Sequence, residues 1–213
     1  MLTSSPTPVA LLGGAGKAGR PLVQAALAAG HHVRALLRHP DDFPFRHPRL
    51  TVVPGDARDP GALRQLLRGS HALLSTLGNP KGEPTPMLST VTGLLLKALP
   101  EAGIRRYVAV TSLYDTGRPQ PDAATAQAAA YMDQHYPKFM ADRRLELALL
   151  SASGLDWTCA RLPLVVEAPA LGPARAQRDG LPGPTITSAD LAQFLLAQLT
   201  SAQYWQRAPF VAN

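Results

Sequence analysis

A glycine-rich segment near the N-terminus, residues 13–19 (GGAGKAG), has the residue types and spacing to hold a phosphate group. It follows a short apolar run, residues 9–12, and opens a stretch with helical apolar spacing. A turn from a strand into a helix points unpaired backbone N–H groups at an anion, and glycines let the anion approach the backbone. The glycines fit two spacings, GxGxxG from Gly14 or GxxGxxG from Gly13, and both use Gly16 and Gly19. In this context the segment predicts a dinucleotide pyrophosphate site rather than an ordinary turn.

The end of the second predicted strand bears on which dinucleotide binds. This strand, residues 32–37, is followed by Arg38, and the first carboxylate after it is Asp41. A carboxylate directly after the strand would bind the ribose 2′-hydroxyl of NAD, whereas arginine suits the 2′-phosphate of NADP. Guanidinium and phosphate pair through charge-assisted, often bidentate hydrogen bonds. We therefore expect NADPH as the cofactor, with NADH as the alternative.

A third candidate segment, residues 53–59 (VPGDARD), follows the next predicted strand. Asp56 offers a carboxylate that can accept a hydrogen bond from the amino group of adenine. Asp59 directly precedes Pro60, an order typical of a helix cap followed by the first helical residue. The segment predicts an adenine contact and a helix start.

The elements that must position these segments alternate along the chain, short apolar runs with longer helical patterns. This alternation indicates a parallel sheet covered by helices. We predict strands at residues 9–12, 32–37, 50–53, 72–76, 106–110 and 156–162, an edge strand at 209–212, and helices at 17–29, 59–68, within 85–102, and from 188 or 190 to 200. The predicted fold is α/β: a Rossmann-type, doubly wound, mostly parallel sheet in a single domain, residues 1–213, with a flexible tail at 1–6.

Two segments interrupt this alternation, residues 117–137, rich in proline and alanine, and residues 167–184, rich in proline and glycine. Both follow predicted strands, and loops that leave the carboxyl ends of parallel strands line the ligand crevice. Two interpretations stay open for these loops: they form the substrate side of the site, or they are solvent loops without a role.

Composition limits the remaining classes of function. The apolar share of 46% and the charged share of 17% are typical of a globular chain, and no apolar run is long enough to cross a bilayer. The net charge of +6 comes from scattered arginines that are not clustered into a nucleic-acid-binding face. A single cysteine and no basic, apolar leader favour a cytoplasmic protein. We expect a monomer or homodimer with no metal site and with no nucleic acid or membrane as partner.

With these segments identified, the chain resembles the atypical short-chain dehydrogenases/reductases, specifically the group of NADPH-dependent flavin reductase and biliverdin-IXβ reductase. The resemblance runs nearly from end to end. It rests on residues 13–20, 35–38, 53–56, 74–78, 110–112, 153–158 and 186–191.

The resemblance implies a role for individual residues. The pyrophosphate would be held by five residues of the glycine-rich segment: Gly13, Gly16, Lys17, Ala18 and Gly19. Arg38 would bind the 2′-phosphate, and the adenine and ribose would meet Asp56, Ala57, Leu77 and Gly78. Thr111 and Ser112 would lie beside the nicotinamide, and Ser112 matches a serine near the hydride-transfer position, which makes it the candidate catalytic residue.

The chain also departs from the family. Typical short-chain dehydrogenases carry a Tyr-x-x-x-Lys pair, yet none of the five tyrosines is followed four residues later by lysine. A histidine near the active site of biliverdin reductases falls at Leu164, and this departure counts against bilin reduction. Asp142 matches an acidic position before a long helix, and Arg143 stands where a relative has histidine.

These observations favour an NADPH-dependent oxidoreductase that passes hydride to a flat conjugated acceptor, such as free flavin or a quinone. A non-catalytic sensor that binds NADPH and alters a protein surface is the alternative. A sugar-nucleotide epimerase is disfavoured because the Tyr–Lys pair is missing and the chain has no room for a substrate domain.

Overall fold

An eight-stranded sheet forms the centre of the computed structural model, which describes residues 7–79, 86–112, 114 and 121–213. The strand order is β3-β2-β1-β4-β5-β6-β10-β8. The strands are β1 (Val9–Leu12), β2 (Val33–Leu37), β3 (Leu50–Pro54), β4 (Ala72–Ser75), β5 (Arg106–Thr111), β6 (Asp156–Arg161), β8 (Arg175–Gln177) and β10 (Phe210–Ala212). Neighbouring strands are parallel except for β10 with β8. The direction of winding reverses between β1 and β4, so the predicted doubly wound sheet is confirmed.

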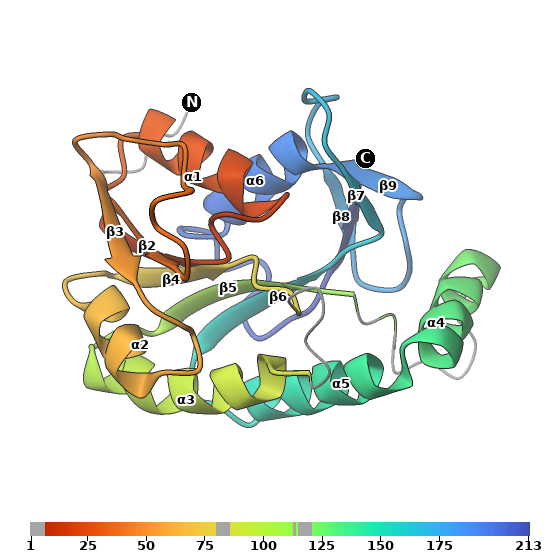
Figure 1. The fold of residues 1–213 in the computed structure, drawn as a ribbon. Helices are drawn as coiled ribbons and strands as arrows, with labels where there is room; N and C mark the ends of the chain where they lie inside the picture. The colour runs from red at the N-terminus through yellow and green to blue at the C-terminus, as the bar shows by residue number, and fades with distance from the viewer. Residues whose placement is uncertain (1–6, 80–85, 113, 115–120) are drawn as a thin grey trace.

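Helices cover both faces of this sheet (Figure 1). Helices α1 (Gly19–Ala28) and α6 (Ser188–Ala197) pack together on one face. The other face carries α2 (Pro60–Leu67), α3 (Leu88–Glu101) and α5 (Pro137–Ser151). Helix α4 (Ala123–His135) projects beyond the sheet next to α5, and β7 (Leu164–Val166) pairs with β9 (Thr185–Thr187) in a separate two-stranded ladder. Within the described part of the chain, no helix is long and apolar enough to cross a membrane.

The core consists of two apolar layers, one on each side of the sheet. Alternate residues of β1 feed different layers, because Ala10 and Leu12 join the layer under α2 and α3, whereas Val9 and Leu11 join the layer under α1 and α6. All four are fully buried or nearly so. Burial on both faces explains why the strand reads as an unbroken apolar run rather than an alternating one.

Local signals fix several helix ends. The Asp59 carboxylate accepts a hydrogen bond from the Gly61 N–H at 2.8 Å, and Pro60 begins α2, as predicted. The Thr187 hydroxyl accepts from the Asp190 N–H at the start of α6 and donates to the Asp190 carboxylate. Burial raises the pKa of Asp190, but donors that include the Leu171 N–H, Thr187 and Asn213 outweigh burial and hold it below its ordinary value. This carboxylate ties the C-terminus and the loop before β8 to α6.

Several sequence predictions of elements are wrong or incomplete. Residues 123–135 of the predicted loop 117–137 form α4, because a run of alanines with a capping Asp122 favours helix. The structure adds β7, β8 and β9, none of which was predicted, and β10 is not an edge strand, because β8 covers its outer side. The long helix that the resemblance implied after Asp142 is α5. Asp142 lies inside α5 rather than before it. The tail at 1–6 and the predicted helix start at 85 lie outside the described residues.

Candidate functional site

A cavity of about 460 Å³ lies across the carboxyl ends of β1, β2, β4 and β5. It crosses the point where the winding of the sheet reverses, which is where doubly wound sheets bind ligands. Nine of the predicted binding residues line it: Gly13, Gly16, Lys17, Ala18, Arg38, Asp56, Ala57, Leu77 and Gly78. The structure therefore brings most of the predicted site together in one place.

The glycine-rich loop forms the middle of this cavity, and two of its glycines are required by close packing. Gly13 has φ +79°, and a Cβ there would lie 2.7 Å from the Thr76 backbone. A Cβ on Gly19 would lie 2.0 Å from the Gly13 carbonyl oxygen, so Gly19 closes the turn from behind. At Gly16 a Cβ would meet only that oxygen, at 3.3 Å, so the space above Gly16 is open. The Ala18 side chain does not cap the first turn of α1. The Arg20 N–H donates to the Gly16 carbonyl oxygen at 3.0 Å, so it is the N–H groups before Arg20 that an anion can bind.

One end of the cavity carries charged groups from β2 and β3. Arg38 is exposed there, and its guanidinium forms no hydrogen bond with the described residues. The Asp56 carboxylate accepts two hydrogen bonds from the Arg58 guanidinium, at 3.0 and 2.8 Å, and one from the Arg58 N–H at 2.8 Å. These bonds hold the pKa of Asp56 below its ordinary value, so it stays ionised, and the nearby Arg38 acts in the same direction. This end therefore combines the Asp56 carboxylate, a hydrogen-bond acceptor held in place by Arg58, with the Arg38 guanidinium, which a phosphate can reach.

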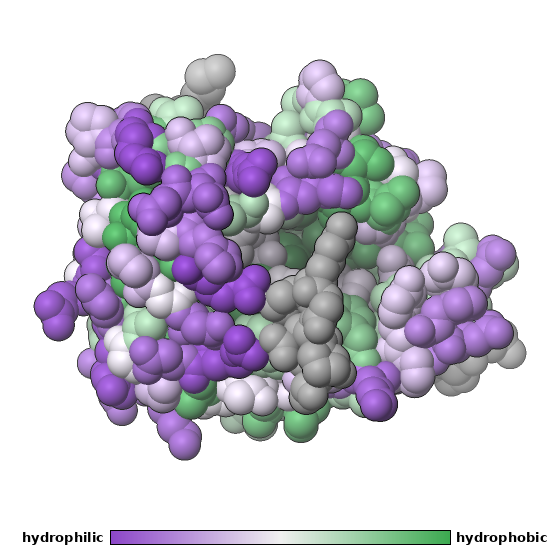
Figure 2. Space-filling model, viewed as in Figure 1, coloured by the Kyte–Doolittle hydropathy of each residue, from purple (hydrophilic) through white to green (hydrophobic). Residues whose placement is uncertain are grey.

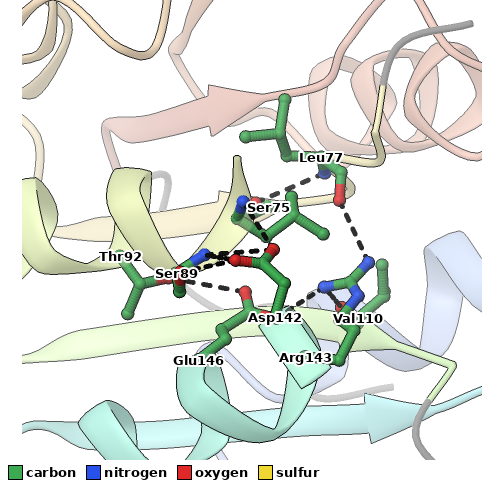
Figure 3. Close-up of polar contacts among 9 residues, drawn as sticks. Ser75, Leu77, Ser89, Thr92, Val110, Asp142, Arg143 and Glu146 are labelled. Atoms are coloured by element: carbon green, nitrogen blue, oxygen red, sulfur yellow. Dashed lines mark hydrogen bonds and ion pairs between the residues drawn. The ribbon is translucent and has the colours of Figure 1, made fainter. Parts of the chain in front are cut away.

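The other end of the cavity is formed by residues that follow β4, β5 and β6. Leu77, Met87, Val110, Leu162 and Val165 supply apolar walls. Arg143 of α5 also reaches this end, where its guanidinium lies between the carbonyl groups of Leu77 and Val110 (Figure 3). The sequence analysis singled out Arg143 only because a relative has histidine at that position. Of the five apolar wall residues, it predicted Leu77 as a site residue and missed the other four.

A second cavity, of about 880 Å³, adjoins the first. The two share Lys17, Leu162 and Val165 as lining residues, and the Lys17 ammonium donates to the Val165 carbonyl oxygen at 3.4 Å. The remaining walls come from Ser112 and Tyr114 after β5, from Ala124, Gln127, Ala128, Tyr131 and Met132 of α4, and from residues 163–164 and 181–184. A hydrogen bond at 3.0 Å from the Leu181 N–H to the Thr125 hydroxyl holds α4 against the last of these loops.

Most of this second lining is apolar. Figure 2 shows green, apolar surface around the loops of β7 to β9, whereas purple, hydrophilic surface dominates the side of β2 and β3. Residues from both segments that the sequence analysis expected to be loops, 117–137 and 167–184, line this cavity. This placement favours the interpretation that the segments form the substrate side of the site over the interpretation that they are solvent loops without a role. The segments are the source of the larger and more apolar cavity.

Three predicted site residues lie elsewhere than on the first cavity. Gly19 is behind the loop, as described above. Thr111 is buried at the end of β5 and lines neither cavity, and Ser112 is half-buried and lines the second. Leu164, the position at which the resemblance implied a departure from biliverdin reductases, is largely exposed and lines the second cavity.

The ionisable groups near these cavities are few. Burial raises the pKa of the Tyr114 hydroxyl, which donates to the Leu162 carbonyl oxygen at 2.9 Å. Burial also raises the pKa of Cys159 to about 12, so this thiol is protonated and unreactive. Of the described residues, no histidine lines either cavity, and no cluster of His, Cys, Asp or Glu is suited to a metal ion. Among the described residues, the lining of the first cavity offers the cations Lys17 and Arg38 and the backbone of the glycine-rich loop.

These features fit a dinucleotide. The open space above Gly16, the start of α1 without a side-chain cap and the exposed Arg38 match the pyrophosphate and a further phosphate. The elongated cavity runs from Arg38 past the glycine loop to the walls after β5, which matches two nucleotide halves joined at their centre.

Comparison with known proteins agrees with this geometry. The model of the NAD(P)H-binding family matches residues 13–202 of the chain. A short-chain dehydrogenase/reductase from Veillonella parvula DSM 2008, solved in complex with NADP, superposes with a TM-score of 0.80 at 18% identity, covering 98% of this chain and 95% of that one. ChuY, an anaerobilin reductase from Escherichia coli O157:H7, superposes with a TM-score of 0.78 at 22% identity, covering 97% of each chain. No curated protein sequence matches the chain.

Proposed function

The chain belongs to the NAD(P)H-binding family, and we propose that it is an NADPH-dependent oxidoreductase that reduces a flat conjugated acceptor such as free flavin or a quinone. The observation that carries this proposal is the junction of the two cavities. A cavity with the features of a dinucleotide site lies next to a larger apolar one, and the two share Lys17, Leu162 and Val165 as lining residues. A donor and a planar acceptor can therefore meet at that junction.

In this proposal the first cavity holds the cofactor through a few named groups. The backbone of the loop from Gly13 to Ala18, with Lys17, binds the pyrophosphate, and Arg38 binds the 2′-phosphate that distinguishes NADPH from NADH. Asp56 and Ala57 meet the adenine, and Leu77 and Gly78 lie at the ribose. When bound, the nicotinamide supplies the hydride, and the protein supplies orientation.

The second cavity limits the class of acceptor. Its lining is mostly apolar and includes Tyr131 and Met132, residue types that pack well against a planar ring. The chain lacks the Tyr-x-x-x-Lys motif with which typical short-chain dehydrogenases protonate the alkoxide formed in carbonyl reduction. A reduced flavin or quinone is a delocalised anion and a weaker base, so water can protonate it. The lining and the lack of an acid–base pair favour conjugated acceptors over simple ketones.

The proposal is tested by NADPH oxidation with free flavin, quinones and simple ketones as separate acceptors. We expect turnover with the first two and little with the third. The Gly16→Val variant serves as the control, because turnover that persists in it would come from elsewhere. Tight NADPH binding without turnover on any acceptor would contradict the enzyme and favour the alternative of a redox sensor.

A further inference from the structure

Arg143 brings a buried positive charge to the end of the first cavity opposite Arg38. It is only 4% exposed, yet it is one of the residues that line the cavity. Burying a guanidinium costs free energy unless all of its N–H groups are paired, and a well-packed apolar residue is often as stable at such a place. A buried arginine at a cavity wall therefore needs a reason beyond packing.

The contacts of Arg143 within the protein use only part of its capacity. Its Nη1 donates to the Glu146 carboxylate at 2.6 Å and to the Val110 carbonyl oxygen at 3.2 Å. Its Nη2 has a long contact of 3.5 Å with the Leu77 carbonyl oxygen, and its Nε is buried with no hydrogen-bond partner among the residues that the structure describes. A guanidinium has five N–H donors, so at least one of them is left for a ligand.

The surroundings hold this guanidinium in place. Glu146 accepts a second hydrogen bond, at 3.4 Å, from the Thr92 hydroxyl of α3. Asp142, one residue before Arg143, accepts hydrogen bonds from the N–H groups of Leu88 and Ser89 and so caps α3 with a side chain from α5. Helices α3 and α5 are thereby locked together under the cavity, and Arg143 cannot readily turn away.

We propose that Arg143 is the anchor for the nicotinamide–ribose half of the dinucleotide, where it donates a hydrogen bond to an oxygen of that half. This inference rests on the proposed cofactor site. If Arg38 and Asp56 take the adenine half and the glycine loop takes the pyrophosphate, the half left over lies beyond β4, among Leu77, Val110 and Arg143. A guanidinium does not release its proton near neutral pH, so Arg143 positions the reacting half and does not act as an acid.

The test compares the affinities of the protein for two ligands that share the adenine half of the dinucleotide. Adenosine 2′,5′-bisphosphate carries the adenine half alone, and NADPH carries both. The chosen variant is the double change Arg143→Met with Glu146→Gln, because Arg143→Met by itself would leave a buried carboxylate unpaired and destabilise the fold. Arg143→Lys, which keeps the charge beside Glu146, is the second variant. Arg144→Met is the matched control, since Arg144 is the next residue on α5 but is half-exposed and pairs with Asp133.

We expect the double variant to bind NADPH about tenfold to a hundredfold more weakly, the usual loss for a hydrogen bond to a charged group, with unchanged binding of the bisphosphate. Arg143→Lys should show the same selective loss, smaller in size, and Arg144→Met should show none. Calorimetry measures both affinities without turnover, and thermal unfolding confirms that each variant is folded.

Equal losses for the two ligands in the variants would show that Arg143 only shapes the cavity, and no loss for either would show that it does not touch the ligand. Either result overturns the inference. A wild-type protein that binds both ligands but reduces no acceptor would contradict the proposed enzyme and leave the inference standing, so the two failures are distinguishable.

Discussion

The two cavities are built in different ways. The first depends on backbone: a glycine loop, the start of α1 and the ends of neighbouring parallel strands, all within residues 9–78 apart from a few wall residues. The second depends on side chains from α4 and on loops that lie far apart in sequence, near residues 112, 128, 164 and 183. A backbone site suits a ligand that is the same throughout a family, whereas a site of side chains can change with the acceptor.

The largest effect should come from closing the backbone site. In Gly16→Val, the new side chain would fill the open space above the loop, where the pyrophosphate approaches, and we expect NADPH binding to be abolished. The fold should persist, because a Cβ at this position meets only the Gly13 carbonyl oxygen.

Gly154→Val is the matched control, since Gly154 is exposed, has nothing within 4 Å of a Cβ and lies away from both cavities. Calorimetry and thermal unfolding of both variants check this prediction. Normal NADPH binding by Gly16→Val would remove the loop from the site.

The next effect concerns the phosphate that distinguishes the two cofactors. Replacing Arg38 by Ala should weaken NADPH about tenfold to a hundredfold and leave NADH almost unchanged, because only NADPH offers a charged partner to the guanidinium. Titration with both cofactors measures the difference, and NADH is the internal control. Equal losses for the two would contradict the role of Arg38.

A substitution in the second cavity should weaken binding of the acceptor and leave binding of the cofactor unchanged. Ala128→Trp fills the second cavity from α4, so we expect the KM for the acceptor to rise at least about tenfold while NADPH binding is unchanged. Ala126→Trp is the control, because Ala126 lies on the same helix and is exposed without lining the cavity. Steady-state kinetics with flavin or quinone separates the two variants. Loss of NADPH affinity in Ala128→Trp would show that the two cavities are not separate sites.

The smallest effect on the rate should come from removing side chains that could donate a proton to the acceptor. Ser112→Ala should cost about tenfold in rate and Tyr131→Phe almost nothing, whereas loss of a general acid typically costs a hundredfold or more. Between about pH 6 and 9 the rate should be nearly flat, because the raised pKa of Tyr114 keeps its hydroxyl protonated and the lowered pKa of Asp56 keeps it ionised throughout. A thousandfold loss in either variant, or a pH limb that vanishes with it, would identify an acid that this account lacks.

The same contrast, between features set by nearby residues and features set by distant ones, explains which parts of the fold and the site the sequence predicts. Strands β1 to β6, the glycine loop, Arg38 and the cap at Asp59 follow from local signals, such as an apolar run, a glycine spacing and a residue just after a strand. Arg143 gave no such signal, because its role depends on α5 lying under the cavity, 66 residues after Leu77 in the chain. Helix α4 was not predicted, because the prolines around it favoured a loop, whereas only its alanines favoured a helix. Its contact with the loop at Leu181 joins residues that are far apart in sequence, so no local signal predicts it.

We propose that the two cavities, which share Lys17, Leu162 and Val165 as lining residues, form one site. A crystal structure of the protein with NADPH tests it most directly. We predict the pyrophosphate on the loop from Gly13 to Ala18, the 2′-phosphate on Arg38, and the nicotinamide ring at the junction with one face open to the second cavity. A nicotinamide ring sealed from the second cavity, or a cofactor bound away from the glycine loop, would contradict the account.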